Sequence, residues 1–199
     1  MPPEAVKAIN KLAHDHGVYG TDAVNRYVAE AKALGFDVVE ISTGFIGLPT
    51  DSVVGLVERV TKAGLKAKPE VGIRFGAGGS TSAEELAAEG TQDVGWLIAR
   101  AKRVLDAGAD IIMIESEGIT ESVTTWRTEV VARIIDALGL DKAMFEAAEP
   151  AVFEWYIKNY GNEVNLFVDH SQIVQLECLR AGIWGTKSTW GRILNFSAA

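Results

Sequence analysis

The sequence predicts an α/β fold of the parallel (β/α) barrel (TIM) type, incomplete, with about six of the eight strands that a closed barrel contains. Helix-like stretches alternate with short apolar stretches, and a glycine follows most of the helices. Repeats of this kind imply parallel strands joined by helical crossovers. The strands are almost wholly apolar, which is typical of strands covered on both faces. An open, doubly wound sheet satisfies the same pattern, so either the sheet is open or part of a barrel is missing.

The predicted elements follow one another in a single domain of residues 1–199. Helices are predicted at 3–15, 22–34, 51–63, 93–107, 121–138, 150–160 and 171–181. Strands are predicted at 17–19, 37–42, 65–73, 109–115, 142–146 and 164–169. Thr50 or Asp51 is expected to cap the third helix. The glycine- and serine-rich stretch 75–90 is expected to form a long loop, a kind that is often functional.

Composition and charge exclude several classes of function. The formal net charge is −8, which disfavours binding to nucleic acid phosphates. The sequence contains no apolar run of about 18 residues, so no membrane span is expected. The N-terminus lacks the pattern of a signal peptide, and the single cysteine, Cys178, excludes an internal disulfide. These features together predict a cytoplasmic protein.

An acidic side chain lies in or just after five consecutive predicted strands. These residues are Glu40, Glu70, Glu115, Glu146 and Asp169. The carboxyl ends of parallel barrel strands meet on one face, where catalytic residues gather, so we expect a shared polar site there. Structural ion pairs with lysine or arginine are the alternative. Clustered carboxylates favour Mg²⁺ as the cofactor, and His170, directly after the last strand, is a further candidate for the site.

Positive and small residues near the same strand ends are candidates for binding an anion. Arg74 is the best of them, because Gly72 allows close approach and a glycine-rich loop follows. Lys68 is a second candidate, and a surface lysine at the start of the strand is its alternative interpretation. Ser42, at the end of the strand 37–42, is assigned to the same substrate-binding set.

Five stretches together resemble the phosphosulfolactate synthase family, including its plant heat-stress-associated and bacterial relatives. They read LGFDVVEIS (34–42), LKAKPEVGIRF (65–75), DAGADIIMIESEG (106–118), KAMFEAAEP (142–150) and YGNEVNLFVDHSQIVQLECLRAGIWG (160–185). Their order and spacing carry the resemblance, since each stretch alone is generic. The last stretch is more similar to the heat-stress branch than to the archaeal enzymes.

The resemblance implies a (β/α)₈ barrel and a Mg²⁺-dependent lyase. Archaeal members of the family add sulfite to phosphoenolpyruvate during coenzyme M biosynthesis. The family also has two βα units before the region matched here, which would leave this chain with about six strands. Exposed strand edges in such a fold predict a homo-oligomer.

The resemblance also implies roles for individual residues. Glu115 and Glu146 would hold the magnesium ion, and Arg74 would hold phosphate or sulfite. Glu40 and Glu70 would be further ligands or the acid that protonates carbon, and Asn165 would donate to a substrate oxygen. A non-catalytic, stress-associated barrel protein acting through protein contacts is an alternative function. The third possible function is that of another barrel enzyme, which acts on a phosphorylated or enolisable acid.

Overall fold

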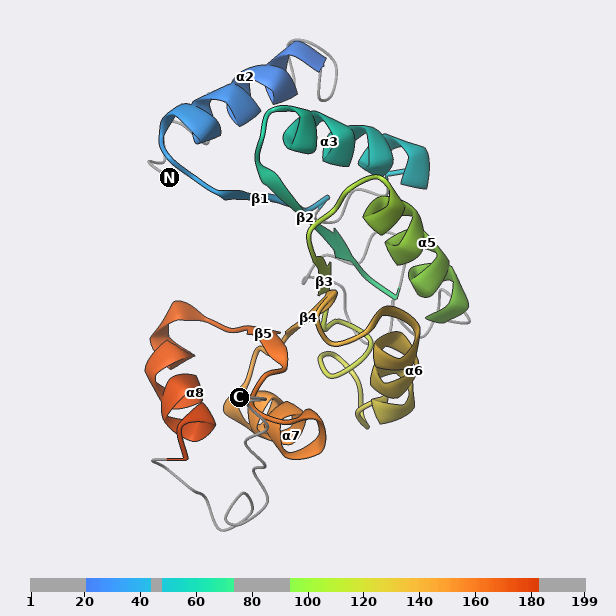
Figure 1. The fold of residues 1–199 in the computed structure, drawn as a ribbon. Helices are drawn as coiled ribbons and strands as arrows, with labels where there is room; N and C mark the ends of the chain where they lie inside the picture. The colour runs from blue at the N-terminus through green and yellow to red at the C-terminus, as the bar shows by residue number, and fades with distance from the viewer. Residues whose placement is uncertain (1–20, 44–47, 74–93, 183–199) are drawn as a thin grey trace.

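The computed structural model describes residues 21–43, 48–73 and 94–182, in which five strands alternate with helices (Figure 1). The strands are β1 (Val38–Ile41), β2 (Lys66–Val71), β3 (Ile112–Ile114), β4 (Ala143–Glu146) and β5 (Asn165–Phe167). The α-helices are α2 (Thr21–Ala33), α3 (Thr50–Lys62), α5 (Val94–Asp106), α6 (Thr128–Leu138), α7 (Pro150–Tyr160) and α8 (Ile173–Arg180). A short 3₁₀-helix, η1 (His170–Gln172), precedes α8.

The five strands form one sheet in the order β1-β2-β3-β4-β5, and all four pairings are parallel. Each strand therefore pairs with the strand before it in the sequence, and the helices line the outer side of the curved sheet (Figure 1). The predicted parallel α/β fold is thus confirmed. The expected strand at 17–19, the helix at 3–15 and the loop at 75–90 lie outside the described residues.

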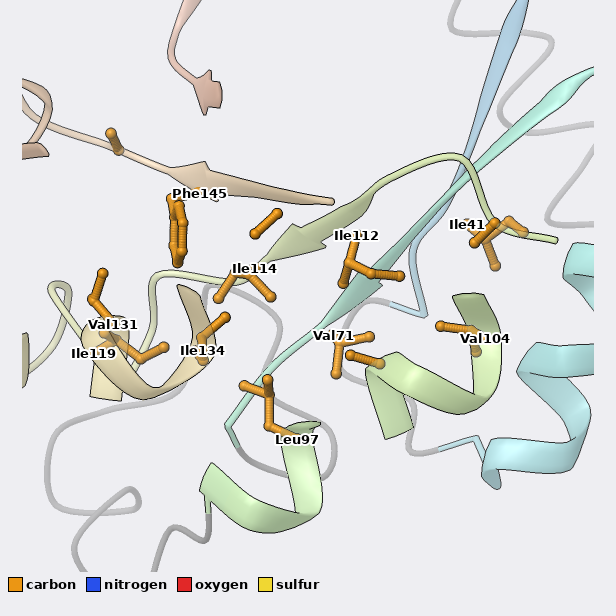
Figure 2. Packing of buried hydrophobic residues seen from close by; sticks show 14 of the residues in the cluster. Ile41, Val71, Leu97, Val104, Ile112, Ile114, Ile119, Val131, Ile134 and Phe145 are labelled. Atoms are coloured by element: carbon orange, nitrogen blue, oxygen red, sulfur yellow. The ribbon is translucent and has the colours of Figure 1, made fainter. Parts of the chain in front are cut away.

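Alternate residues of the strands pack against the helices to form the core (Figure 2). On β2, for example, Ala67 and Val71 are buried, whereas Lys68 and Glu70 between them are partly exposed. The helices supply the matching apolar stripes, such as Leu97 on α5, which is fully buried. Burying one large aliphatic side chain stabilises the fold by about 1.5–3 kcal/mol. Because one set of alternate strand residues packs against the helices, the other, more polar set faces the concave side of the sheet.

Lys68 of β2 and Phe167 of β5 meet across the concave face of the sheet. The Lys68 ammonium lies 4.7 Å from the ring centroid of Phe167, although β3 and β4 separate the two strands in the sheet. The sheet is therefore curved, as the strands of an incomplete barrel are.

The segment between β3 and α6 differs from the prediction. We expected a helix from residue 121, but α6 begins only at Thr128, and residues 115–127 form a loop. Ser122 has a φ of 53°, which no right-handed helix accommodates, and Val123 and Thr124 are β-branched residues of low helix propensity. The loop has a functional consequence, because it carries acidic side chains over the end of the sheet.

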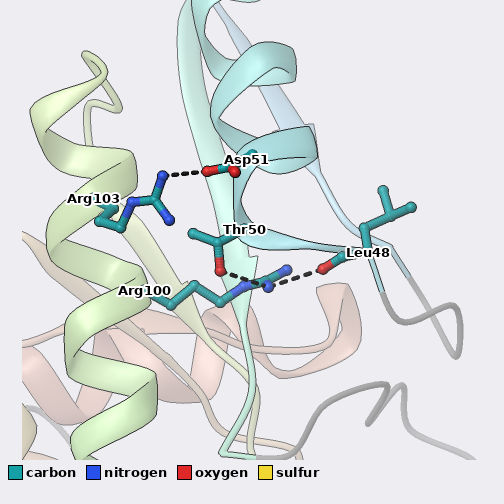
Figure 3. Close-up of polar contacts among 5 residues, drawn as sticks. All are labelled: Leu48, Thr50, Asp51, Arg100 and Arg103. Carbon is teal, nitrogen blue, oxygen red and sulfur yellow. Dashed lines mark hydrogen bonds and ion pairs between the residues drawn. The ribbon is translucent and has the colours of Figure 1, made fainter.

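A buried arginine on α5 forms hydrogen bonds with residues at the start of α3 (Figure 3). Arg100 donates to the carbonyl oxygen of Leu48 at 2.9 Å and to the hydroxyl of Thr50 at 3.3 Å. Its guanidinium also lies 5.2 Å from the ring centroid of Trp96, and burial lowers its pKa. The expected side-chain cap is wrong: Thr50 is the first helical residue, and the N-cap position belongs to Pro49.

Within the described ranges, none of the helices has both the length and the hydropathy that crossing a bilayer requires.

Candidate functional site

Four glutamates of the predicted acidic row project from the same face of the sheet. Glu40, Glu70 and Glu146 occupy the strand positions that alternate with buried core residues, and Glu115 directly follows β3. The parallel register aligns Ile114 with Phe145, so the next residues, Glu115 and Glu146, lie side by side. Glu70 forms a side-chain hydrogen bond with Glu115 and interacts electrostatically with Glu40 and Glu146. The structure therefore brings the four carboxyl groups together at one end of the strands.

Three carboxylates converge most closely at the ends of β3 and β4. Glu115, Glu121 and Glu146 each offer an oxygen, and these oxygens lie within 4.8 Å of one another. Glu115 is only 5% exposed, whereas Glu121 and Glu146 are partly buried. Glu121 lies in the loop that follows β3, so the three carboxylates come from the ends of two strands and from this loop.

Burial and like charge together perturb Glu115 strongly. Its pKa is raised from 4.5 to about 9, first by burial, then by its hydrogen bond with Glu146 and by the charge of that residue. A hydrogen bond from the backbone N–H of Glu117, at 3.1 Å from Oε1, partly offsets the rise. Glu115 thus carries a proton at neutral pH unless a cation replaces it.

Glu70 lies beside this group and is perturbed in the same direction. Burial raises its pKa, a hydrogen bond with Ser42 lowers it, and the neighbouring charges of Glu40 and Glu146 raise it again. A raised pKa favours the protonated form of a carboxyl group, which is the form that acts as a general acid.

Lys68 brings a positive charge onto the same face. Its ammonium lies 2.7 Å from Oε2 of Glu40 and 3.6 Å from the sulfur of Met113, and it faces the ring of Phe167. The side chain is only 13% exposed, so the interpretation as a surface lysine is wrong. Lys68 is therefore a positive group on the concave face, where the other charged groups described above are acidic.

Two other predicted substrate-binding residues occupy the same end of the sheet. Ser42, just after β1, forms its hydrogen bond with Glu70, and Gly72 directly follows β2. The remaining candidate, Arg74, lies outside the described residues.

Two predicted site residues do not join the group. Asn165 begins β5, and its amide donates to the carbonyl oxygen of Leu140 at 2.8 Å, a contact at the opposite, amino end of the strands. His170 has a side chain 91% exposed, and its Nδ1 lies 3.4 Å from Asp169. Asp169 in turn accepts a hydrogen bond from the backbone N–H of Ser171 at the start of η1, which is a local turn contact. The structure therefore places neither Asn165 nor His170 with the carboxyl groups at the strand ends.

Sequence reasoning missed Glu121 and Ser116. Both were hidden by the expectation that a helix begins at residue 121, which would have directed Glu121 away from the strand ends. The glycine at 118, followed by β-branched residues at 123–125, is the signal that favours a loop here.

The comparison with protein families decides where this chain belongs. The family described as (2R)-phospho-3-sulfolactate synthase (ComA) matches residues 1–186. The chain belongs to the phosphosulfolactate synthase family. Among the relatives of this family member, the HEAT-STRESS-ASSOCIATED 32 protein of Arabidopsis thaliana is 36% identical over 203 residues, covering 90% of this chain and 71% of the plant protein. The phosphosulfolactate synthase of Methanothermobacter thermautotrophicus is 26% identical, covering 86% of this chain and 65% of the archaeal protein.

Solved structures support the fold of this family member. The N-acetylneuraminate lyase from Fusobacterium nucleatum in complex with pyruvate matches with a TM-score of 0.53 and 13% identity, over 81% of this chain and 49% of the lyase. A structure of PhdJ bound to a substrate intermediate matches with a TM-score of 0.51 and 16% identity, over 85% of this chain and 50% of that chain. At such low identity the likeness concerns the fold alone.

The donor set suits the magnesium ion that the family implies. Magnesium prefers oxygen ligands and is usually held by one or two carboxylates together with water and substrate oxygens. Glu115, Glu121 and Glu146 supply carboxylate oxygens only, at mutual distances that one ion can span. The raised pKa of Glu115, to which burial and the neighbouring Glu146 contribute, is also what a nearby cation would relieve.

Proposed function

We propose that this chain carries the site of a phosphosulfolactate synthase-like lyase, which adds sulfite to phosphoenolpyruvate with the help of Mg²⁺. The observation that supports the proposal most is the convergence of carboxyl groups at the strand ends in a chain of this family. The carboxyl ends of barrel strands are where enzymes with this fold place their catalytic groups.

Glu115 and Glu146 would hold the magnesium ion, as the resemblance implies. The bound cation would supply positive charge next to the substrate carboxylate, where negative charge develops as sulfite attacks. The two glutamates would hold this charge at a fixed position, because one is buried and the other accepts a hydrogen bond from the backbone N–H of Ser116.

The remaining residues would bind anions and move a proton. In the addition, sulfite sulfur forms a bond with the methylene carbon of phosphoenolpyruvate, and the neighbouring carbon takes up a proton. Glu70 is suited to supply this proton, because its pKa is raised by burial. Lys68 is suited to attract the phosphate or sulfite group, with Glu40 holding its ammonium in place.

A direct assay tests the proposal. Loss of phosphoenolpyruvate is followed with the purified protein, with and without sulfite, and with and without Mg²⁺. We expect loss that needs both sulfite and Mg²⁺. The absence of turnover under all of these conditions would remove the synthase function.

A non-catalytic role in heat stress is the second candidate. It is supported by the higher identity to the heat-stress-associated plant protein, 36%, than to the archaeal synthase, 26%. Under this alternative the assay gives no turnover, while a stable protein partner is recovered.

We also propose a cytoplasmic location and a homo-oligomeric state. Light scattering tests the oligomeric state, because a clean monomer contradicts it.

A further inference from the structure

The loop after β3 folds back on itself and returns a carboxylate to the strand ends. The backbone N–H groups of residues 119, 120 and 121 all donate to the carbonyl oxygen of Ser116, at 2.9, 2.9 and 3.1 Å. Gly118 supplies the left-handed conformation, with a φ of 80°, and its N–H donates to the carbonyl oxygen of Glu121 at 2.9 Å. This turn brings Glu121 close to Glu115, although six positions separate them in the sequence.

Ser116 lies between the two partly buried carboxylates of the group. Its hydroxyl oxygen is 2.6 Å from Oε2 of Glu121 and 3.2 Å from Oε2 of Glu146. Its backbone N–H also donates to Oε2 of Glu146, at 3.4 Å. A hydroxyl has a single hydrogen, so it donates to Glu121 at the shorter distance while the N–H holds Glu146. Ser116 is only 3% exposed, so these hydrogen bonds are shielded from water.

We propose that Glu121 is a third ligand of the magnesium site and that Ser116 is the positioning residue that holds Glu121 and Glu146 toward the ion. This inference rests on the proposed function, because it assigns further residues to the same cation site. Their proposed role lies in the affinity and geometry of the cation site.

The physical reason is the repulsion among like charges. Carboxylates with oxygens within 4.8 Å of one another separate unless a cation, a shared proton or hydrogen-bond donors hold them. Ser116 supplies such donors to two of the three, and the N–H of Glu117 supplies one to Glu115. The loop therefore preorganises the ligands and reduces the free energy needed to gather them around an ion. Hydrogen-bonding partners of this kind commonly change metal affinity by about 10–100-fold.

Binding of Mn²⁺, a probe for the magnesium site, tests the inference without measuring activity. The bound fraction is followed by the loss of the electron paramagnetic resonance signal of free Mn²⁺, and Mg²⁺ competition confirms a shared site. The variants are Glu121→Gln, Ser116→Ala and the double variant. Glu163→Gln is the matched control, since it removes the same charge from an exposed position before β5, at the opposite end of the strands.

We expect Glu121→Gln and Ser116→Ala each to weaken Mn²⁺ binding by about 10–100-fold, and Glu163→Gln to leave it unchanged. The double variant should lose less than the product of the two single losses, because Ser116 acts in part through Glu121. Circular dichroism verifies that each variant is folded. If Ser116→Ala does not fold, Glu121→Gln still tests the inference, because glutamine keeps the shape of the glutamate side chain.

Two results would overturn the inference in distinguishable ways. If Glu121→Gln binds Mn²⁺ as the wild type does while Glu146→Gln loses binding, the cation site stands and Glu121 does not belong to it. If Glu115→Gln and Glu146→Gln both bind as the wild type does, the proposed cation site itself is absent, and the roles of Glu121 and Ser116 fall with it.

Discussion

Replacing Glu115 with glutamine should change how the stability of the protein depends on pH. In the folded protein the pKa of Glu115 is raised to about 9, against an ordinary value of 4.5. The folded state therefore binds one more proton than the unfolded state throughout the window from about pH 4.5 to 9. Stability contributed by this proton is complete below that window and is lost as the pH rises through it. Glu115→Gln keeps the shape of the side chain and removes its titration.

The magnitude follows from linkage. One extra proton in the folded state lowers the free energy of unfolding by at most about 1.4 kcal/mol for each pH unit. Between pH 6 and 8 the wild type should therefore lose up to about 2.7 kcal/mol from this group, and the variant should lose none of it. Glu146 shares the interaction, so the observed loss belongs to the pair and is expected below this limit.

Urea unfolding at pH 6, 7 and 8, with a chelator to remove divalent cations, measures the effect. The slope of unfolding free energy against pH should be smaller in Glu115→Gln than in the wild type. Glu163→Gln, which removes an exposed carboxylate, should keep the wild-type slope. Equal slopes in the wild type and in Glu115→Gln would refute the reasoning, because the buried carboxyl would then not hold its proton. Adding Mg²⁺ should flatten the wild-type slope, since a bound cation replaces that proton.

Three further outcomes are expected. Arg100→Met should lower the free energy of unfolding by about 2–3 kcal/mol in urea, because it leaves the carbonyl oxygen of Leu48 without its charged donor. Phe145→Ala should cost about 3–5 kcal/mol in the same measurement, since the ring is 1% exposed and stacks on Tyr156 with centroids 4.9 Å apart. Lys68→Met should raise the KM for phosphoenolpyruvate with the fold intact by circular dichroism, and an unchanged KM would exclude Lys68 from anion binding.

Local signals in the sequence sufficed for most of the fold. The helix predicted at 150–160 is α7, because Pro150 favours the first helical turn and a glycine follows the last residue. Most of the strands were likewise visible as short, mainly apolar runs that follow a glycine, whereas β2 alternates charged and buried residues. The start of α6 was missed because Glu121 resembles a residue of a first helical turn, while the backbone at 122 and the hydrogen bonds to Ser116 favour a loop.

The candidate site was predictable where the strands themselves present the side chain. Glu70, Glu115 and Glu146 sit at or next to the ends of strands, so the parallel arrangement alone brings them near one another. Asn165 lies apart from this group because it is at the start of β5 rather than the end. His170 also lies apart, because it begins η1, beyond the end of β5, and its imidazole is exposed to solvent.

The sequence by itself determined the family, the parallel α/β fold and the row of acidic residues, since these depend on residue order and on periodicity along single elements. Only the tertiary structure decided which carboxylates meet. The curvature of the sheet brings Lys68 of β2 to Phe167 of β5, and the turn at 116–121 returns Glu121 to the strand ends. Both are relations between segments distant in the sequence, and no local pattern encodes the distances between them.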